Sequence, residues 1–106
     1  MIAQVRIYTI NKGMMEEWIK LFNEKLVPIH AKVGINIVGA WVNRSQNEFI
    51  WIRTFEDEQE AEEKNRAYLQ HPDRRALGNS VQAYEAKTEV RTVEDVFAPV
   101  GTPIAS

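Results

Sequence analysis

The side chains best suited to chemistry in this sequence are arginines, aromatic residues and one histidine at an apolar position. They are Arg6, Tyr8, His30, Trp41, Trp51 and Arg53. Arginine offers paired N–H donors to an anion, and tryptophan and tyrosine offer flat walls for an organic ring. We therefore expect a pocket for a small aromatic or acidic organic molecule. Its predicted ligand contacts are Arg6, Tyr8, Trp41, Trp51 and Arg53.

His30 is the main candidate for catalysis. Its ordinary pKa of about 6.5 suits proton transfer, and Tyr8 is a second residue that could move a proton. A lone histidine one turn past Leu26 is also consistent with a packing residue at a helix end. Both interpretations stay open at the level of the sequence.

The arginines also have a structural interpretation, because burying a guanidinium costs several kcal/mol unless it is paired. Arg6 and Arg91 could pair with Glu89 or Asp95 on a neighbouring strand. Arg53, beside Trp51, is the arginine that we expect to meet a ligand. The sequence does not decide between ligand contacts and structural ion pairs.

Several kinds of chemistry are disfavoured. The chain has no cysteine, and its two histidines, His30 and His71, make a poor zinc set, although one of them could serve as an axial haem ligand. The acidic run at residues 56–63 is typical of a solvated helix face. There is no phosphate loop, dinucleotide fingerprint or nucleophile elbow. We expect no metal and no cofactor.

Alternation of apolar and polar residues predicts four strands, and apolar residues at helical spacing predict helices between them. Pro28 is expected to end or kink the first helix. The resulting β-α-β-β-α-β order is the ferredoxin-like pattern of an α+β domain with one four-stranded antiparallel sheet. The strands are predicted at residues 3–10, 35–42, 48–55 and 87–97, and the helices at 14–26, at 58–69 after an Asp57 cap, and from Pro72 onward.

The two faces of this sheet differ in composition. We expect the aliphatic face, with Val5, Ile7 and Ile52, to pack on the helices, and Trp41 and Trp51 to share the opposite face with the arginines. Exposed tryptophans on one face mark an interface, and an identical face of a second chain is the simplest cover. The sequence therefore predicts a homodimer.

Composition supports a single domain. The chain has 106 residues, 44% of them hydrophobic and 26% charged, and a net charge of −2. That charge does not indicate nucleic-acid binding, which usually needs a clearly basic domain. No apolar run reaches the length of a membrane span. Without a signal-like N-terminus, a cytoplasmic protein is expected.

Four segments resemble the NIPSNAP family when taken in order. They are Val5–Gly13, Gly34–Trp41, Asn47–Phe55 and His71–Leu77. The resemblance implies a ferredoxin-like domain at residues 1–97, followed by a tail at 98–106. It also implies pairing into a dimeric α+β barrel that encloses a cavity in each half. Relatives by fold include cofactor-free monooxygenases, haem-degrading oxygenases and lactone isomerases.

Two functions from different classes follow. The first is a cofactor-free enzyme of oxygenase or isomerase type that acts on the bound molecule. The alternative is a non-catalytic dimeric binding or interaction module, whose aromatic face is only an interface. The sequence does not say whether the protein is an enzyme.

Overall fold

The computed structural model describes residues 1–97, and the predicted tail at 98–106 lies outside them. Four strands and two helical regions follow one another in the order β-α-β-β-α-β. The strands are β1 (Ile2–Ile10), β2 (Asn36–Asn43), β3 (Glu48–Phe55) and β4 (Glu85–Glu94). The helical elements are α1 (Met15–Leu21), the π-helical turn η1 (Phe22–Leu26), α2 (Val27–Lys32), α3 (Glu58–Gln70), α4 (Pro72–Arg75) and the short 3₁₀ turns η2 (Arg44–Gln46), η3 (Gly78–Ser80) and η4 (Gln82–Tyr84).

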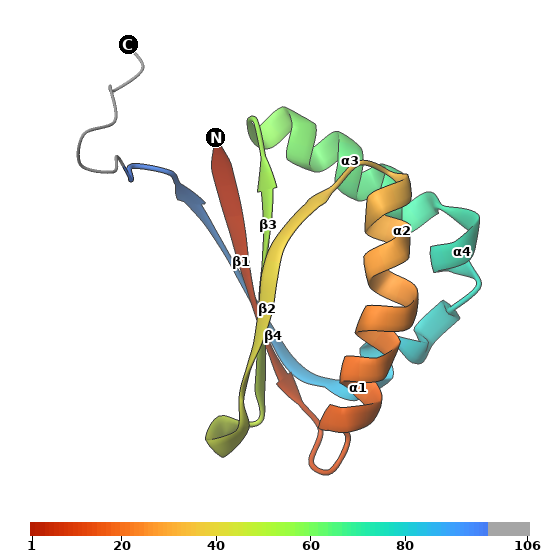
Figure 1. Ribbon diagram of the computed structural model, residues 1–106. Helices are drawn as coiled ribbons and strands as arrows, with labels where there is room; N and C mark the ends of the chain where they lie inside the picture. The colour runs from red at the N-terminus through yellow and green to blue at the C-terminus, as the bar shows by residue number, and fades with distance from the viewer. Residues whose placement is uncertain (98–106) are drawn as a thin grey trace.

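The strands form one antiparallel sheet in the order β2-β3-β1-β4. Figure 1 shows α1, α2, α3 and α4 on one side of this sheet, while the other side carries no helix within residues 1–97. The predicted α+β class and ferredoxin-like order are confirmed.

The prediction of which sheet face packs on the helices was wrong. Phe49, Trp51, Arg53 and Phe55 of β3 are buried under the helices, whereas Ile52 on the other face is only half-buried. The larger rings gain more from burial, since each aromatic side chain buries roughly 150–250 Å². The helix side therefore takes the aromatic face and leaves the aliphatic face open.

Trp41 and Trp51 lie on opposite faces, which corrects their predicted common face. Register places Trp41 opposite Ile50 and Ala40 opposite Trp51, and paired residues in an antiparallel sheet share a face. The register of β2 against β3 shifts between Ile37 and Gly39. Such a bulge changes which side chains of a strand face the core, and alternation alone gave no sign of it.

The core is an aromatic cluster between β3 and the first helix. Trp18 is fully buried, with ring centroids 5.6 Å from Phe49 and 6.4 Å from Phe22. Phe22 in turn lies 4.8 Å from Phe49 and 5.2 Å from Trp51, edge to face. This cluster fixes the first helix against the centre of the sheet, and with it the residues that follow in α2.

The first helix continues past Pro28 rather than ending near it. Pro28 lacks the N–H that an α-helix would bond to the carbonyl of Glu24, and the π-helical turn η1 lies directly before it. The Val27 N–H bonds to the Phe22 carbonyl across this wider turn. The continuation carries His30 one turn beyond Leu26 and buries it under the sheet.

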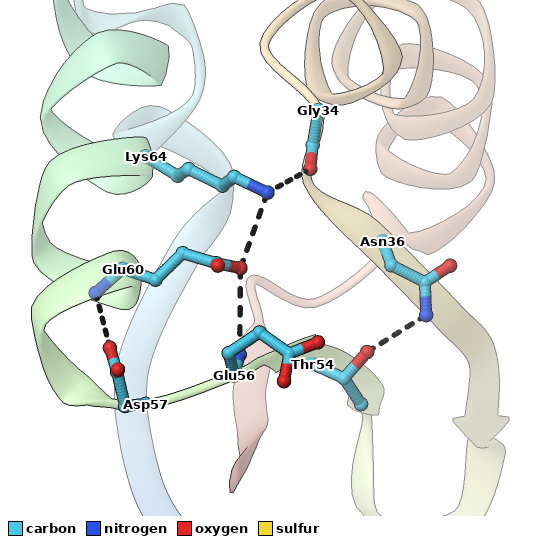
Figure 2. A network of polar contacts seen from close by, with 7 residues as sticks. All are labelled: Gly34, Asn36, Thr54, Glu56, Asp57, Glu60 and Lys64. Carbon is cyan, nitrogen blue, oxygen red and sulfur yellow. Dashed lines mark hydrogen bonds and ion pairs between the residues drawn. The ribbon is translucent and has the colours of Figure 1, made fainter. Parts of the chain in front are cut away.

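The second helical region begins at a capped terminus and breaks up at its end. The Asp57 carboxylate accepts from the Glu60 N–H at 2.8 Å, as predicted for the cap, and Lys64 joins Glu60 to the Gly34 carbonyl (Figure 2). After α4 the chain does not continue as the predicted regular helix. Gly78, the first residue of η3, adopts a φ of +56°, which interrupts helical geometry, and the chain goes on only as the short 3₁₀ turns η3 and η4.

Removing the cap should weaken α3 measurably. We expect Asp57→Ala to lower the free energy of unfolding by about 1 kcal/mol, since the Glu60 N–H loses its acceptor. Glu62→Ala, at an exposed position of the same helix, is the control and should change stability by less than about 0.5 kcal/mol. Urea unfolding followed by circular dichroism measures both. Equal effects of the two substitutions would show that the cap contributes nothing.

Candidate functional site

A cavity of about 190 Å³ lies between the helix-side face of the sheet and the α3–α4 region. We call it the arginine cavity, because Arg6, Arg53 and Arg74 all line it. Its other walls include Tyr8, Trp18, Trp51, Asn65, Tyr68, Val81, Gln82, Glu85 and Thr88. Polar or charged side chains therefore reach the arginine cavity from β1, β3, α3, α4 and β4.

Arg53 is held in place from three directions. Its guanidinium donates to the Gln4 side-chain oxygen at 2.6 and 3.2 Å and to the Asn65 side-chain oxygen at 3.1 Å. Its third nitrogen donates to His30 Nε2 at 3.3 Å. Arg53 is 1% exposed, and burial, reinforced by the charge of Arg6, lowers its pKa to about 10. At neutral pH it is a fixed buried cation whose donors are almost all engaged.

His30 acts as an acceptor that holds Arg53. Its Nδ1 lies 2.7 Å from the Leu26 carbonyl, which can only accept, so Nδ1 carries the proton and Nε2 is free to accept from Arg53. The imidazole is 0% exposed, and burial lowers the pKa of His30 to about 4, with a smaller effect from the charge of Arg53. His30 is therefore neutral at pH 7, with both ring nitrogens occupied.

The other two arginines each pair with a tyrosine. Arg6 Nε donates to the Tyr8 hydroxyl at 3.0 Å, and Arg74 Nε donates to the Tyr68 hydroxyl at 3.1 Å. Within residues 1–97, the terminal nitrogens of Arg6 and Arg74 make no hydrogen bond or ion pair. Unlike Arg53, these two arginines retain free paired donors at the cavity wall.

Trp51 lies close to two cations. The guanidinium carbons of Arg6 and Arg53 are each 5.4 Å from the centroid of its ring, close enough for cation–π attraction. The indole N–H groups of Trp18 and Trp51 are buried and have no acceptor within the described part of the chain. Both nitrogens are shielded from solvent, so these donors lie within the packed aromatic core and do not face the open part of the cavity.

The electrostatic balance of the arginine cavity is positive. None of its three arginines has a carboxylate within 4 Å among residues 1–97, and Glu85 is the one acidic side chain among the lining residues. Burial raises the pKa of Glu85, against the opposing effect of Arg6 and Arg74. Burial likewise raises the pKa of Tyr68, so its phenol is neutral.

Four of the five predicted contact residues come together. Arg6, Tyr8, Trp51 and Arg53 all line the arginine cavity, while Trp41 lies on the other sheet face. The predicted ion pair of Arg91 with Glu89 is present at 3.5 Å, but on the open face. The ion pair considered for Arg6, with Glu89 or Asp95, does not form within residues 1–97.

Sequence reasoning missed Tyr68, Arg74 and Glu85. Nothing in the sequence distinguishes Arg74, which is buried, from its exposed neighbour Arg75. Tyr68 and Arg74 meet because the chain turns at His71, whose side chain caps α4 by accepting from the Asp73 N–H. Glu85 opens β4 two residues before the predicted start of that strand.

No three acidic, histidine or cysteine side chains within residues 1–97 gather in a way that could hold a metal ion. No helix in the same range has the length and apolarity needed to cross a membrane.

The NIPSNAP family model matches residues 3–96, and the chain belongs to this family. A NIPSNAP domain protein from Burkholderia xenovorans is similar in structure, with a TM-score of 0.83, 20% identity, and coverage of 93% of this chain and 99% of that chain. A NIPSNAP family protein from Agrobacterium tumefaciens gives 0.82 and 21%, covering 98% of each chain. No curated protein matches the sequence significantly.

The fold is also shared outside the family. A mutant of a cofactor-independent oxygenase from Streptomyces nogalater superimposes with a TM-score of 0.66 at 14% identity, covering 92% of this chain and 94% of that chain. Identity this low establishes a common fold and leaves function to the site itself.

The low pKa of His30 makes stability depend on pH. The unfolded chain binds a proton at His30 below about pH 6.5 and the folded chain only below about 4, so stability should fall as the pH falls through that window. The loss can reach about 3 kcal/mol. We expect His30→Gln to flatten this dependence in urea unfolding series. A pH dependence of His30→Gln identical to that of the wild type would contradict this.

Proposed function

We propose that this protein binds a small aromatic acid in the arginine cavity. The observation that carries the proposal is the set of three arginines, without a carboxylate partner within residues 1–97, in a cavity walled by aromatic rings. Buried cations without counter-ions are costly, and an anionic ligand would offset that cost. The paired terminal nitrogens of Arg6 and Arg74 suit a carboxylate, and the ring of Trp51 suits an aromatic body.

An enzyme of cofactor-free oxygenase or isomerase type is the more specific form of this proposal. It is supported by the fold shared with the Streptomyces nogalater oxygenase and by the arginine donors at the cavity wall, which could stabilise negative charge on a ligand oxygen. The alternative, a non-catalytic binding module, is favoured by His30. Both of its ring nitrogens are engaged, so the expected proton carrier is occupied in holding Arg53.

We also propose a homodimer formed through the open face of the sheet. Trp41 is 51% exposed there, beside the half-buried Ile50 and Ile52. An apolar face of this kind is covered most simply by a second copy. The arginine cavity lies on the other side of the sheet, so each protomer would keep its own site.

Ligand binding should depend on Arg74 and not on its neighbour. Benzoate titrated into the protein should quench the fluorescence of the cavity-lining Trp18 and Trp51. We expect Arg74→Ala to weaken benzoate by about 10- to 100-fold, on the scale of a charge-assisted hydrogen bond. Arg74→Lys should recover part of the loss, because lysine keeps the charge without the planar fork.

Arg75→Ala, next to Arg74 but exposed, is the matched control and should bind benzoate as the wild type does. The proposal fails if benzoate and related aromatic acids leave the fluorescence unchanged. It also fails if Arg74→Ala and Arg75→Ala bind equally well.

The dimer can be tested separately from the ligand. Light scattering at micromolar concentration should give about twice 12.2 kDa. Trp41→Glu should shift the protein to monomer, because it places an unpaired charge in the interface. Leu69→Glu, at a similarly exposed apolar residue on the helix side, should remain dimeric. A monomeric wild type, or a Trp41→Glu variant that stays dimeric, would rule out this interface.

A further inference from the structure

The arginine cavity is rich in hydrogen-bond donors and poor in acceptors. Because arginine can only donate, the Tyr8 and Tyr68 oxygens accept from Arg6 and Arg74, and each phenol hydrogen is left to donate elsewhere. No acceptor within residues 1–97 takes either hydrogen. Together with the free terminal nitrogens of Arg6 and Arg74, these phenols would stabilise more than one ligand oxygen. A ligand with only one carboxylate would leave part of this set unused.

Glu85 is the exception among these donors. It is the one carboxylate among the lining residues, it is half-buried, and it forms no hydrogen bond or ion pair within the described part of the chain. The titratable groups that line the cavity with it are Arg6 and Tyr8 from β1, Arg53 from β3, Tyr68 from α3 and Arg74 from α4. A hydroxyl on the ligand would need an acceptor for its hydrogen, and Glu85 is the one charged acceptor in place.

We propose that the ligand is an organic acid with a second, acidic hydroxyl of phenolic or enolic type, and that Glu85 accepts the proton of that hydroxyl. This rests on the proposed function, in which the carboxylate of the ligand meets the arginines. In the transfer the ligand O–H bond breaks, the proton bonds to a Glu85 carboxylate oxygen, and the electron pair stays on the ligand as an oxyanion. No oxidant or other reactant is needed.

The surroundings of Glu85 favour this transfer. The oxyanion formed meets two phenol donors and the charges of the arginines, a donor set of the kind that stabilises developing negative charge. Burial raises the pKa of Glu85, which makes its carboxylate a better proton acceptor than an exposed one. The net charge of the cavity is unchanged by the transfer, because the proton only moves between two groups inside it. His30 does not compete, since its Nε2 accepts from Arg53.

Proton uptake on binding tests the proposal directly. The probe is 4-hydroxy-3-nitrobenzoate, studied at a pH where the free molecule is already a phenolate. The control ligand is 3-nitrobenzoate, which lacks the hydroxyl. Calorimetric titrations in buffers of different ionisation enthalpy give the number of protons taken up per ligand bound. We expect the wild type to take up close to one proton with the hydroxy probe and none with 3-nitrobenzoate.

Glu85→Gln keeps the size of the side chain and removes the acceptor, so it should bind both probes without proton uptake. Glu89→Gln, on the open face of the same strand, is the control and should behave as the wild type. Absence of uptake in the wild type, or uptake that persists in Glu85→Gln, overturns the role of Glu85 while leaving aromatic-acid binding intact. If 3-nitrobenzoate itself does not bind, the proposed function and this inference both fail.

Discussion

The guanidinium of Arg53 joins three separate elements of this fold through hydrogen bonds. Its hydrogen bonds reach Gln4 on β1, Asn65 on α3 and His30 on α2. All three partners are neutral, so the interior keeps a full positive charge that is hydrogen-bonded but not neutralised. A buried charge without a counter-ion is stable only where hydrogen-bond partners surround it, so it restricts the positions of the neighbouring side chains. Here it fixes the tautomer of His30, the position of α3 over the sheet and the sign of the potential in the arginine cavity.

The aromatic core and the cavity are successive parts of the same sheet face. Toward the first helix, Phe49 packs with Trp18 and Phe22 and excludes water. Toward α3 and α4, Trp51 is flanked by Arg6 and Arg53, and the packing gives way to a cavity. The rings therefore serve both as core and as pocket wall. This explains why the aromatic face is buried under the helices, while the aliphatic face is left open.

Much of the fold follows from local patterns that a single sequence shows. The alternation of β3, the Asp57 cap and the helical spacing from Met15 to Leu26 each reflect near-neighbour physics, and each has its counterpart in the structure. The continuation of the helix past Pro28 does not follow from such patterns. It depends on a π-helical turn directly before Pro28, which accommodates the N–H that proline lacks. The face occupied by Trp41 depends on a bulge of a single residue, which alternation cannot reveal.

The sequence by itself determined the family, the order of elements and a set of arginine and aromatic residues on one face of two strands. Arg6, Tyr8, Trp51 and Arg53 meet because strand alternation and antiparallel pairing are local and regular. Only the tertiary structure decided that this face lies under the helices and that Tyr68, Arg74 and Glu85 complete the cavity. Tyr68 lies on α3, Arg74 on α4 and Glu85 on β4. The turn capped by His71 and the packing of the helices on the sheet bring them to one cavity. Such long-range contacts depend on how whole surfaces fit together, and no spacing along one strand or helix encodes them.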